Sequence, residues 1–205
     1  MAKSSKAWIH QHVNDPYVKR AQAEGMRSRA AYKLQQINEK DKLLKPGMVV
    51  VDLGAAPGGW SQVAGRIAAP VGRVIAIDLL EMQGLAGVTF IRDDFSEGAG
   101  LAALERELEG AAVDLVLSDM APNISGIAQV DQARLIGLVE LALDFSSKHL
   151  KPQGNFLVKV FHGAGFDAFV KAMRAVFVQV QSRKPEASRK GSREVYLLGK
   201  GLKKA

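Results

Sequence analysis

The chain has 205 residues, of which 47% are hydrophobic and 24% charged, and its formal net charge is +7. This length and balance fit one compact domain, and no apolar run approaches the roughly 20 residues of a membrane helix. The absence of cysteine excludes disulfides, thiolate metal ligands and a thiol nucleophile. Together with a polar, basic start that lacks the apolar run of a signal peptide, it fits a cytoplasmic protein.

Strand and helix patterns alternate along the chain. A basic N-terminal arm, residues 1–30, is expected to lie apart from a single domain, residues 31–205, which opens with a helix over 30–39. Apolar, β-branched runs predict strands over 48–53, 74–78, 88–91, 113–118 and 156–160. Helical spacing predicts helices over 60–67, 101–108, 132–149 and 167–176. Two closing strands, around 176–181 and 195–198, are separated by a turn-rich loop, 184–193.

This order of elements predicts an α/β fold of the Rossmann-like type. Strands that alternate with helices form a mostly parallel sheet with helices on both faces. The two closing strands have no helix between them, so we expect an antiparallel C-terminal hairpin at one edge of the sheet.

A glycine-rich loop, DLGAAPGGW over residues 52–60, follows the first expected strand. Glycines let the backbone turn sharply and approach a ligand closely. Here Ala-Ala-Pro interrupts the glycine pattern that receives a pyrophosphate in dinucleotide-binding folds, which argues against an NAD-dependent dehydrogenase. A ligand without a phosphate fits this loop better.

Four aspartates, Asp52, Asp78, Asp94 and Asp119, come at or just after the ends of successive strands, so we expect them at one rim of the sheet. Carboxylates there suit an amino group, a ribose diol, an adenine amine and a cationic sulfonium, the groups of S-adenosylmethionine, and would repel a pyrophosphate. Turn-forming aspartates, which are common after strands, are the alternative.

Four segments together resemble the FtsJ-type family of RNA 2′-O-methyltransferases: DLGAAPGGW, LSDMAPN, FLVKVF and KPEASRKGSREVYLL. The resemblance spans about residues 27–199, with the motifs in the family's order. It implies S-adenosylmethionine as cofactor, contacted by Gly58, Trp60, Asp78, Asp94 and Asp119. It also implies a catalytic Lys-Asp-Lys-Glu tetrad, which maps onto Lys33, Asp119, Lys159 and Glu194.

Lys159 is unusual even without the resemblance, because it interrupts the apolar strand FLVKVF. A buried ammonium is costly unless it is paired, and Asp119 at the neighbouring strand end is a candidate partner. A lysine that reaches solvent from a strand end is the alternative. We expect Lys159 to act as general base or, failing that, as a cation that orients the hydroxyl. Taken alone, Lys33 and Glu194 would read as surface charges.

Two absences narrow the reaction type. Methylation at a pyrimidine carbon commonly uses a cysteine, and amine methyltransferases commonly carry an Asn/Asp-Pro-Pro-aromatic motif where this chain reads DMAPN. Attack by an oxygen remains. A small-molecule O-methyltransferase and a non-catalytic RNA-binding ribosome-assembly protein are the competing readings.

The positive charge is concentrated at the two ends: residues 1–33 carry a net charge of +5 and residues 183–205 a net charge of +6. Basic ends indicate a polyanionic partner, although solvated tails would look the same. The expected RNA contacts are Lys3, Lys6, Arg27, Arg29, Arg183, Lys184, Arg189, Lys190 and Arg193. Trp8 and Tyr17 could stack on bases or anchor the arm to the domain.

The resemblance also implies a substrate. It points to a uridine ribose in the peptidyl-transferase region of 23S ribosomal RNA, presented within the 50S subunit, with a transfer RNA anticodon loop as the other candidate. A monomer that requires no metal ion and binds no membrane is expected.

Overall fold

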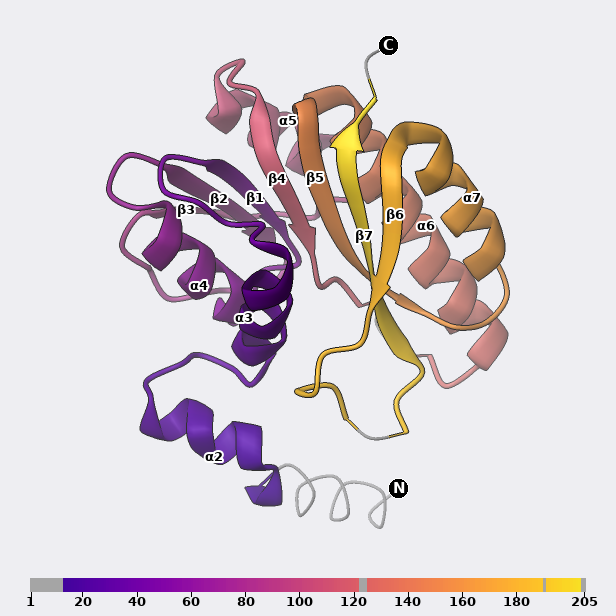
Figure 1. Cartoon of the computed structure of the whole chain (residues 1–205), viewed down its shortest axis with the longest axis horizontal. Coiled ribbons are helices and arrows are strands. Elements are labelled where there is room, and N and C mark those ends of the chain that lie inside the picture. The colour runs from indigo at the N-terminus through magenta and orange to yellow at the C-terminus, as the bar shows by residue number, and fades with distance from the viewer. Residues whose placement is uncertain (1–12, 122–124, 190, 204–205) are drawn as a thin grey trace.

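The computed structural model describes residues 13–121, 125–189 and 191–203. They form one seven-stranded sheet between two layers of helices, with the strand order β3-β2-β1-β4-β5-β7-β6 (Figure 1). The strands are β1 (Val49–Leu53), β2 (Arg73–Asp78), β3 (Val88–Arg92), β4 (Val113–Ser118), β5 (Leu150–Phe161), β6 (Phe177–Arg183) and β7 (Glu194–Leu202). The predicted Rossmann-like architecture is confirmed.

The expected antiparallel C-terminal hairpin is present at one edge of the sheet. Strands β1 to β5 pair in parallel, whereas β7 is antiparallel to both β5 and β6. Helix α7 (Phe166–Val176) carries the chain past the end of β5 to the outer edge, and β7 then fills the position between β5 and β6. The first residues of β7 therefore lie beside the carboxyl end of β5, with Tyr196 opposite Lys159 and Glu194 opposite Phe161.

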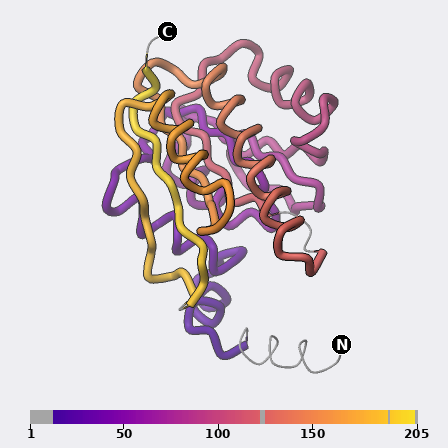
Figure 2. Tube along the Cα trace, turned by 90° about the vertical axis from the view of Figure 1, so that its right-hand side faces the viewer, coloured from indigo at the N-terminus to yellow at the C-terminus, as the bar shows by residue number. Residues whose placement is uncertain are grey.

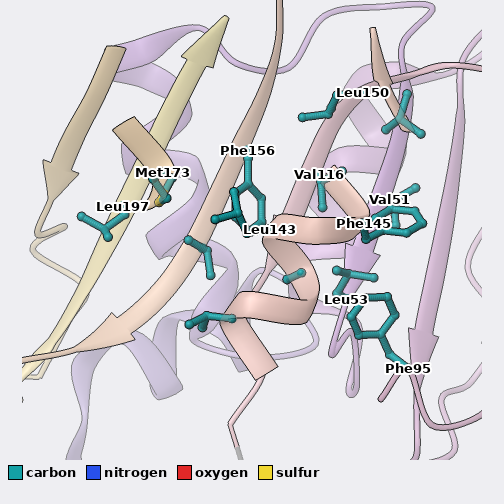
Figure 3. Close-up of a cluster of buried hydrophobic side chains, with 14 of the residues drawn as sticks. Val51, Leu53, Phe95, Val116, Leu143, Phe145, Leu150, Phe156, Met173 and Leu197 are labelled. Carbon is teal, nitrogen blue, oxygen red and sulfur yellow. The ribbon is translucent and has the colours of Figure 1, made fainter. Parts of the chain in front are cut away.

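Helices cover both faces of the sheet, and alternate strand residues supply the two cores. On one face α3 (Ala30–Asp41) and α4 (Gly59–Ala68) pack over a cluster that includes Val50 of β1. On the other face α5 (Gly98–Leu108), α6 (Ala128–His149) and α7 pack over a cluster that includes Val51. Figure 3 shows this second cluster, in which Leu143 and Phe145 of α6 lie over the strands.

The described part of the N-terminal arm does not join the sheet but packs onto the α3–α4 layer. Its helix α2 (Pro16–Ala23) buries Ala21, and Met26 is buried in the same cluster. The ring centroids of Tyr17 and Tyr32 are 5.6 Å apart, so Tyr17 serves as an anchor of the arm. Residues 1–12, including Trp8, lie outside the described residues. Figure 2 shows α2 and the loop between β6 and β7 at the same end of the molecule.

Several elements are longer than their patterns indicated. Helix α5 begins at Gly98 and not at the predicted residue 101. The prediction missed its first turn because Gly-Ala-Gly lacks the apolar spacing by which a helix is recognised. Gly100 is needed there, since a Cβ would lie 2.0 Å from the carbonyl oxygen of Asp94. Strand β5 begins at Leu150, and its pairing with β4 shifts register between Val113 and Leu115. No helix in the described parts of the chain is long and apolar enough to cross a membrane.

Candidate active site

The structure brings the four residues of the expected tetrad together at the carboxyl ends of β4 and β5. Lys159 lies on β5, Asp119 directly follows β4, Glu194 opens β7, and Lys33 comes from α3. The Nζ atom of Lys159 is 3.1 Å from Oδ1 of Asp119, and Nζ of Lys33 is 2.6 Å from Oε1 of Glu194. The site therefore consists of two ion pairs.

Tyr196 joins these two pairs, and sequence reasoning missed it. Its hydroxyl accepts a hydrogen bond from Nζ of Lys33 at 3.1 Å and donates one to Oδ1 of Asp119 at 3.1 Å. The available signal was the spacing, because Glu194 and Tyr196 are two residues apart on one strand and so share a face. Burial raises the pKa of the Tyr196 hydroxyl well above its ordinary value, and the charges of Asp119 and Glu194 raise it further, so this hydroxyl keeps its proton.

The charged groups of the site are largely shielded from solvent, with Lys33 7%, Lys159 8% and Glu194 9% exposed. Burial opposes ionisation of Glu194, but the charge of Lys33 and hydrogen bonds from Lys33 and Ser188 outweigh it, so the pKa of Glu194 is lowered. The Ser188 hydroxyl donates to Glu194 at 2.8 Å. Glu194 is therefore a fixed anion that holds Lys33 in place.

Two cavities meet at Asp119. The larger, of about 450 Å³, lies beyond β1, β2 and β4 and is lined by Asp78, Asp94, Phe95 and Met120 among others. The smaller, of about 160 Å³, lies between residues 28–30 and the loop over residues 54–60. Asp119 lines both. Ligands of open α/β folds bind at this end of the sheet, where the strand order reverses between β1 and β4.

The expectation that four aspartates form this rim is wrong for Asp52. Asp52 is fully buried within β1, lines neither cavity, and accepts a hydrogen bond from the Ser61 hydroxyl at 2.6 Å. Asp52 lies one residue before the end of β1, paired with Ala76 of β2 and Leu117 of β4, and its side chain faces α4, where it meets Ser61. Burial raises the pKa of Asp52 to about 7, against the hydrogen bond from Ser61.

The glycines of the loop over residues 54–60 have little space for a larger side chain. Gly58 has a φ of 103°, and a Cβ there would lie 2.7 Å from Sδ of Met82. Gly58, an expected cofactor contact, lines neither cavity. Trp60 lines the smaller cavity, but its ring is 2% exposed, lies 5.5 Å from the ring of Tyr196, and donates through Nε1 to the Ala30 carbonyl.

Several basic side chains expected at the RNA surface are engaged within the protein. Arg27 donates to the carbonyls of Gln83 at 2.6 Å and Gly84 at 2.7 Å. Arg183 makes two hydrogen bonds to Asp41, at 2.6 and 2.8 Å. These two guanidinium groups hold segments of the fold together.

The remaining basic residues differ in whether their side chains are paired with other groups of the protein. Arg29 pairs with Asp15 at 3.0 Å, Arg189 lies 3.9 Å from the same carboxylate, and Lys184 donates to the Ser192 carbonyl at 2.6 Å. Arg193 is exposed and has no ion pair within the described residues. Lys3, Lys6 and Lys190 lie outside the described residues.

The described part of the chain contains no group of three or more His, Asp or Glu side chains arranged to hold a metal ion.

Comparisons of the sequence with known proteins identify it as similar to methyltransferases. The profile of the FtsJ-like methyltransferase family matches residues 26–202. The chain is 64% identical over 201 residues to ribosomal RNA large subunit methyltransferase E of Azoarcus sp. strain BH72, covering 98% of each chain. It is 59% identical to the protein of that name from Neisseria meningitidis serogroup B, covering 97% of each.

The fold is also similar to that of a solved structure. The crystal structure described as a ribosomal RNA methyltransferase from Plasmodium falciparum superposes with a TM-score of 0.76 at 27% identity, covering 86% of this chain and 98% of that one. The family match extends over most of the chain, and close relatives are similar along nearly their whole length. The chain therefore belongs to the FtsJ-like methyltransferase family.

Proposed function

We propose that the protein transfers a methyl group from S-adenosylmethionine to the ribose 2′-hydroxyl of a uridine in 23S ribosomal RNA of the large subunit. The observation that carries the proposal is the Lys159–Asp119 ion pair at the border of a cavity rimmed by Asp78 and Asp94. The relatives are named ribosomal RNA large subunit methyltransferases, which supports RNA as the substrate. In this proposal the protein acts as a cytoplasmic monomer on the 50S particle and needs no metal ion.

The residues of the larger cavity suit this cofactor. The carboxylate of Asp78 accepts hydrogen bonds from the backbone N–H groups of Ala56 and Leu80, at 2.9 and 2.8 Å, which fix its position at the end of β2. Asp78 would hold the ribose hydroxyls, and Asp94 the adenine amine, both of which donate to carboxylates. When bound, S-adenosylmethionine supplies a methyl group activated by its sulfonium charge.

In this proposal Lys159 removes the proton of the attacking hydroxyl. Its Nζ atom has two contacts with Asp119, one to Oδ1 and one to the backbone carbonyl at 2.6 Å. When the Lys159 amine is unprotonated, it can donate its two N–H groups to Asp119 and use its one lone pair to accept the proton of the ribose hydroxyl. Bound S-adenosylmethionine would supply the methyl carbon to the ribose oxygen, with S-adenosylhomocysteine as the leaving group.

The second ion pair supports this arrangement. Lys33 is held by Glu194 and by the Tyr196 hydroxyl, which also donates to Asp119. Its positive charge stabilises negative charge that develops on the ribose oxygen. Tyr196 thus fixes the distance between the two pairs.

The test supplies radiolabelled S-adenosylmethionine together with 50S particles from cells that lack this activity, or with transfer RNA, and maps the labelled nucleotide. Label on the 2′-oxygen of a uridine in 23S RNA is the expected result. Label in transfer RNA alone would mean that transfer RNA, and not 23S RNA, is the substrate. Cofactor binding without transfer to any RNA would favour the ribosome-assembly reading.

A further inference from the structure

A second groove, not used by the mechanism above, opens on the far side of Ala121 from the cofactor cavity. It encloses about 370 Å³ between the start of α6 and the ends of β5 and β7. Ala121 lines both spaces, so the two lie next to each other at this residue. The groove is lined by Ala121, Gln132, Leu135, Phe161 and Arg193 among others.

Three walls of the groove are joined in sequence to three tetrad residues. Ala121 follows Asp119 by two residues, and Phe161 follows Lys159 by two residues. Arg193 directly precedes Glu194. Because a strand rises about 3.3 Å per residue, the Phe161 wall begins only about 7 Å along β5 from Lys159. A molecule whose hydroxyl reaches Lys159 is therefore within reach of the groove.

The side chains of the groove combine an apolar floor with a cation. Leu135 is buried, and the half-buried Phe161 also lines the groove. Arg193 is exposed and has no ion pair among the described residues, so its guanidinium is available to an anion. An aromatic residue and an arginine that line the same groove are the combination that unstacked bases and their phosphates favour in proteins that bind single-stranded nucleic acid.

The polar groups of the groove are fixed in place. The amide nitrogen of Gln132 donates to the carbonyls of Ala164 at 2.9 Å and Phe161 at 3.4 Å, which ties α6 to the end of β5. The carboxylate of Asp131 accepts the N–H groups of Ser125 at 2.7 Å and Gly126 at 3.2 Å. The Ser125 hydroxyl, which donates to the same carboxylate at 2.6 Å, lowers the pKa of Asp131 together with these two N–H groups.

We propose that this groove receives the base of the nucleotide that is methylated, with Phe161 against the base and Arg193 at a neighbouring phosphate. The inference rests on the proposed function, because it starts from a ribose 2′-hydroxyl at Lys159. The base is attached to the ribose carbon next to the one that carries this hydroxyl, so it must lie within a few bonds of Lys159. A base inside a duplex could not enter the groove, so the target must be unpaired or turned out of its stack.

The test compares four variants by methyl transfer to undermethylated 50S particles. Phe161→Leu removes the ring but keeps an apolar side chain, and it should lower kcat/KM roughly 10–100-fold, the scale of one lost base–aromatic contact. Phe161→Tyr keeps the ring and should retain most of the activity. Arg193→Gln should raise KM and flatten its dependence on salt. Arg174→Gln makes the same charge change on an exposed residue of α7 and should leave transfer unchanged.

Two further measurements separate this inference from other causes. The affinity for S-adenosylmethionine and the melting temperature should be the same in all four variants and the wild type. Uridine 5′-monophosphate, added with S-adenosylhomocysteine, should shift the backbone NMR signals of Phe161 and Arg193, whereas ribose 5-phosphate should not shift that of Phe161.

The outcomes are distinguishable. A wild-type protein that methylates no RNA overturns the proposed function, and the mononucleotide titration still reports on the groove. If the wild type methylates 23S RNA and Phe161→Leu transfers at the wild-type rate with the wild-type KM, the groove is not the base site and the inference is wrong.

Discussion

Lys159 and Asp119 are joined by two contacts, since the lysine Nζ lies 3.1 Å from Oδ1 of Asp119 and donates to its backbone carbonyl at 2.6 Å. The first contact could be lost by rotation of the carboxylate, but the second ties the amine to the backbone at the end of β4. Asp119 also lines both cavities. The reactive amine is therefore fixed with respect to the cofactor cavity by the fold itself.

Removal of this amine should abolish transfer without unfolding the protein. Lys159→Ala should lower the single-turnover rate by about 10²–10⁴, the usual scale for loss of a positioned acid–base group, while S-adenosylmethionine still binds. Lys159→Arg should restore little, because a guanidinium stays protonated and cannot accept a proton. The matched control is Lys151→Ala, which removes another β5 lysine paired with an aspartate, Asp114 at 2.8 Å. A near-normal rate in Lys159→Arg would mean that Lys159 acts as an orienting cation and not as a general base.

The Tyr196 hydroxyl should matter for rate and not for folding. Tyr196→Phe keeps the ring against Trp60 but removes the link between Lys33 and Asp119. We expect kcat to fall roughly 10-fold, the equivalent of one hydrogen bond, and the pH profile of kcat to shift, with unchanged cofactor affinity and melting temperature. Tyr32→Phe removes a buried hydroxyl that donates to Glu24 and is the control. An unaltered pH profile in Tyr196→Phe would leave this residue a packing role only.

Asp78 should decide cofactor affinity. Asp78→Ala should weaken S-adenosylmethionine binding by about 1–3 kcal/mol, because buried ribose hydroxyls lose their acceptor. It also removes the acceptor of the Ala56 N–H, so Asp78→Asn, which keeps one carbonyl oxygen, should bind more tightly than Asp78→Ala. Calorimetry with S-adenosylmethionine, and with NAD as the comparison ligand, measures both. Equal binding of NAD by the wild type would refute the assignment of this cavity.

Arg183 should contribute to stability and not to RNA binding. Its two hydrogen bonds to the buried Asp41, which is also contacted by Lys200 at 2.6 Å, join β6 and β7 to α3. Arg183→Ala should lower the free energy of unfolding by about 1–3 kcal/mol, since Lys200 still pairs with Asp41. The salt dependence of RNA binding should stay as in the wild type. Arg174→Ala, on an exposed arginine, should change neither quantity.

The same pair predicts a dependence on pH. The hydrogen bond from Arg183 and the contact with Lys200 lower the pKa of Asp41 from 3.8 to about 2. A lowered carboxyl pKa stabilises the fold above the unfolded value and loses that contribution as the pH falls through the folded value. The difference in unfolding free energy between wild type and Arg183→Ala should therefore shrink between about pH 4 and pH 2. A constant difference across this range would contradict the assignment.

Asp52 should behave in the opposite way. Burial raises its pKa to about 7, so its contribution to stability is present at low pH and is lost as the pH rises from about 4 through 7. Asp52→Asn keeps an acceptor for the Ser61 hydroxyl and carries no charge. Relative to the wild type it should gain stability as the pH rises from 5 to 8, measured by urea unfolding. A difference that does not vary with pH would mean that Asp52 is not protonated in this range.

Local patterns in the sequence were sufficient for the fold class and the position of the cofactor loop. Strand and helix periods depend on neighbouring residues, so the alternation from β1 to α7 could be predicted, and Gly54 and Gly58 marked the turn. Lys159 could also be singled out, because a charge within an apolar strand conflicts with its own surroundings. These features need no knowledge of which distant segments meet.

The tertiary structure alone decided which side chains meet. The insertion of β7 between β5 and β6 sets the register that places Tyr196 opposite Lys159, and no local pattern encodes that order. Asp52 and Arg183 show the same limit: a strand aspartate turned beneath α4 and a basic residue turned onto Asp41 look in sequence like a rim carboxylate and a surface cation. The physical reason is that burial and ion pairing are properties of contacts between residues far apart in the chain, and these contacts form only when the sheet is assembled.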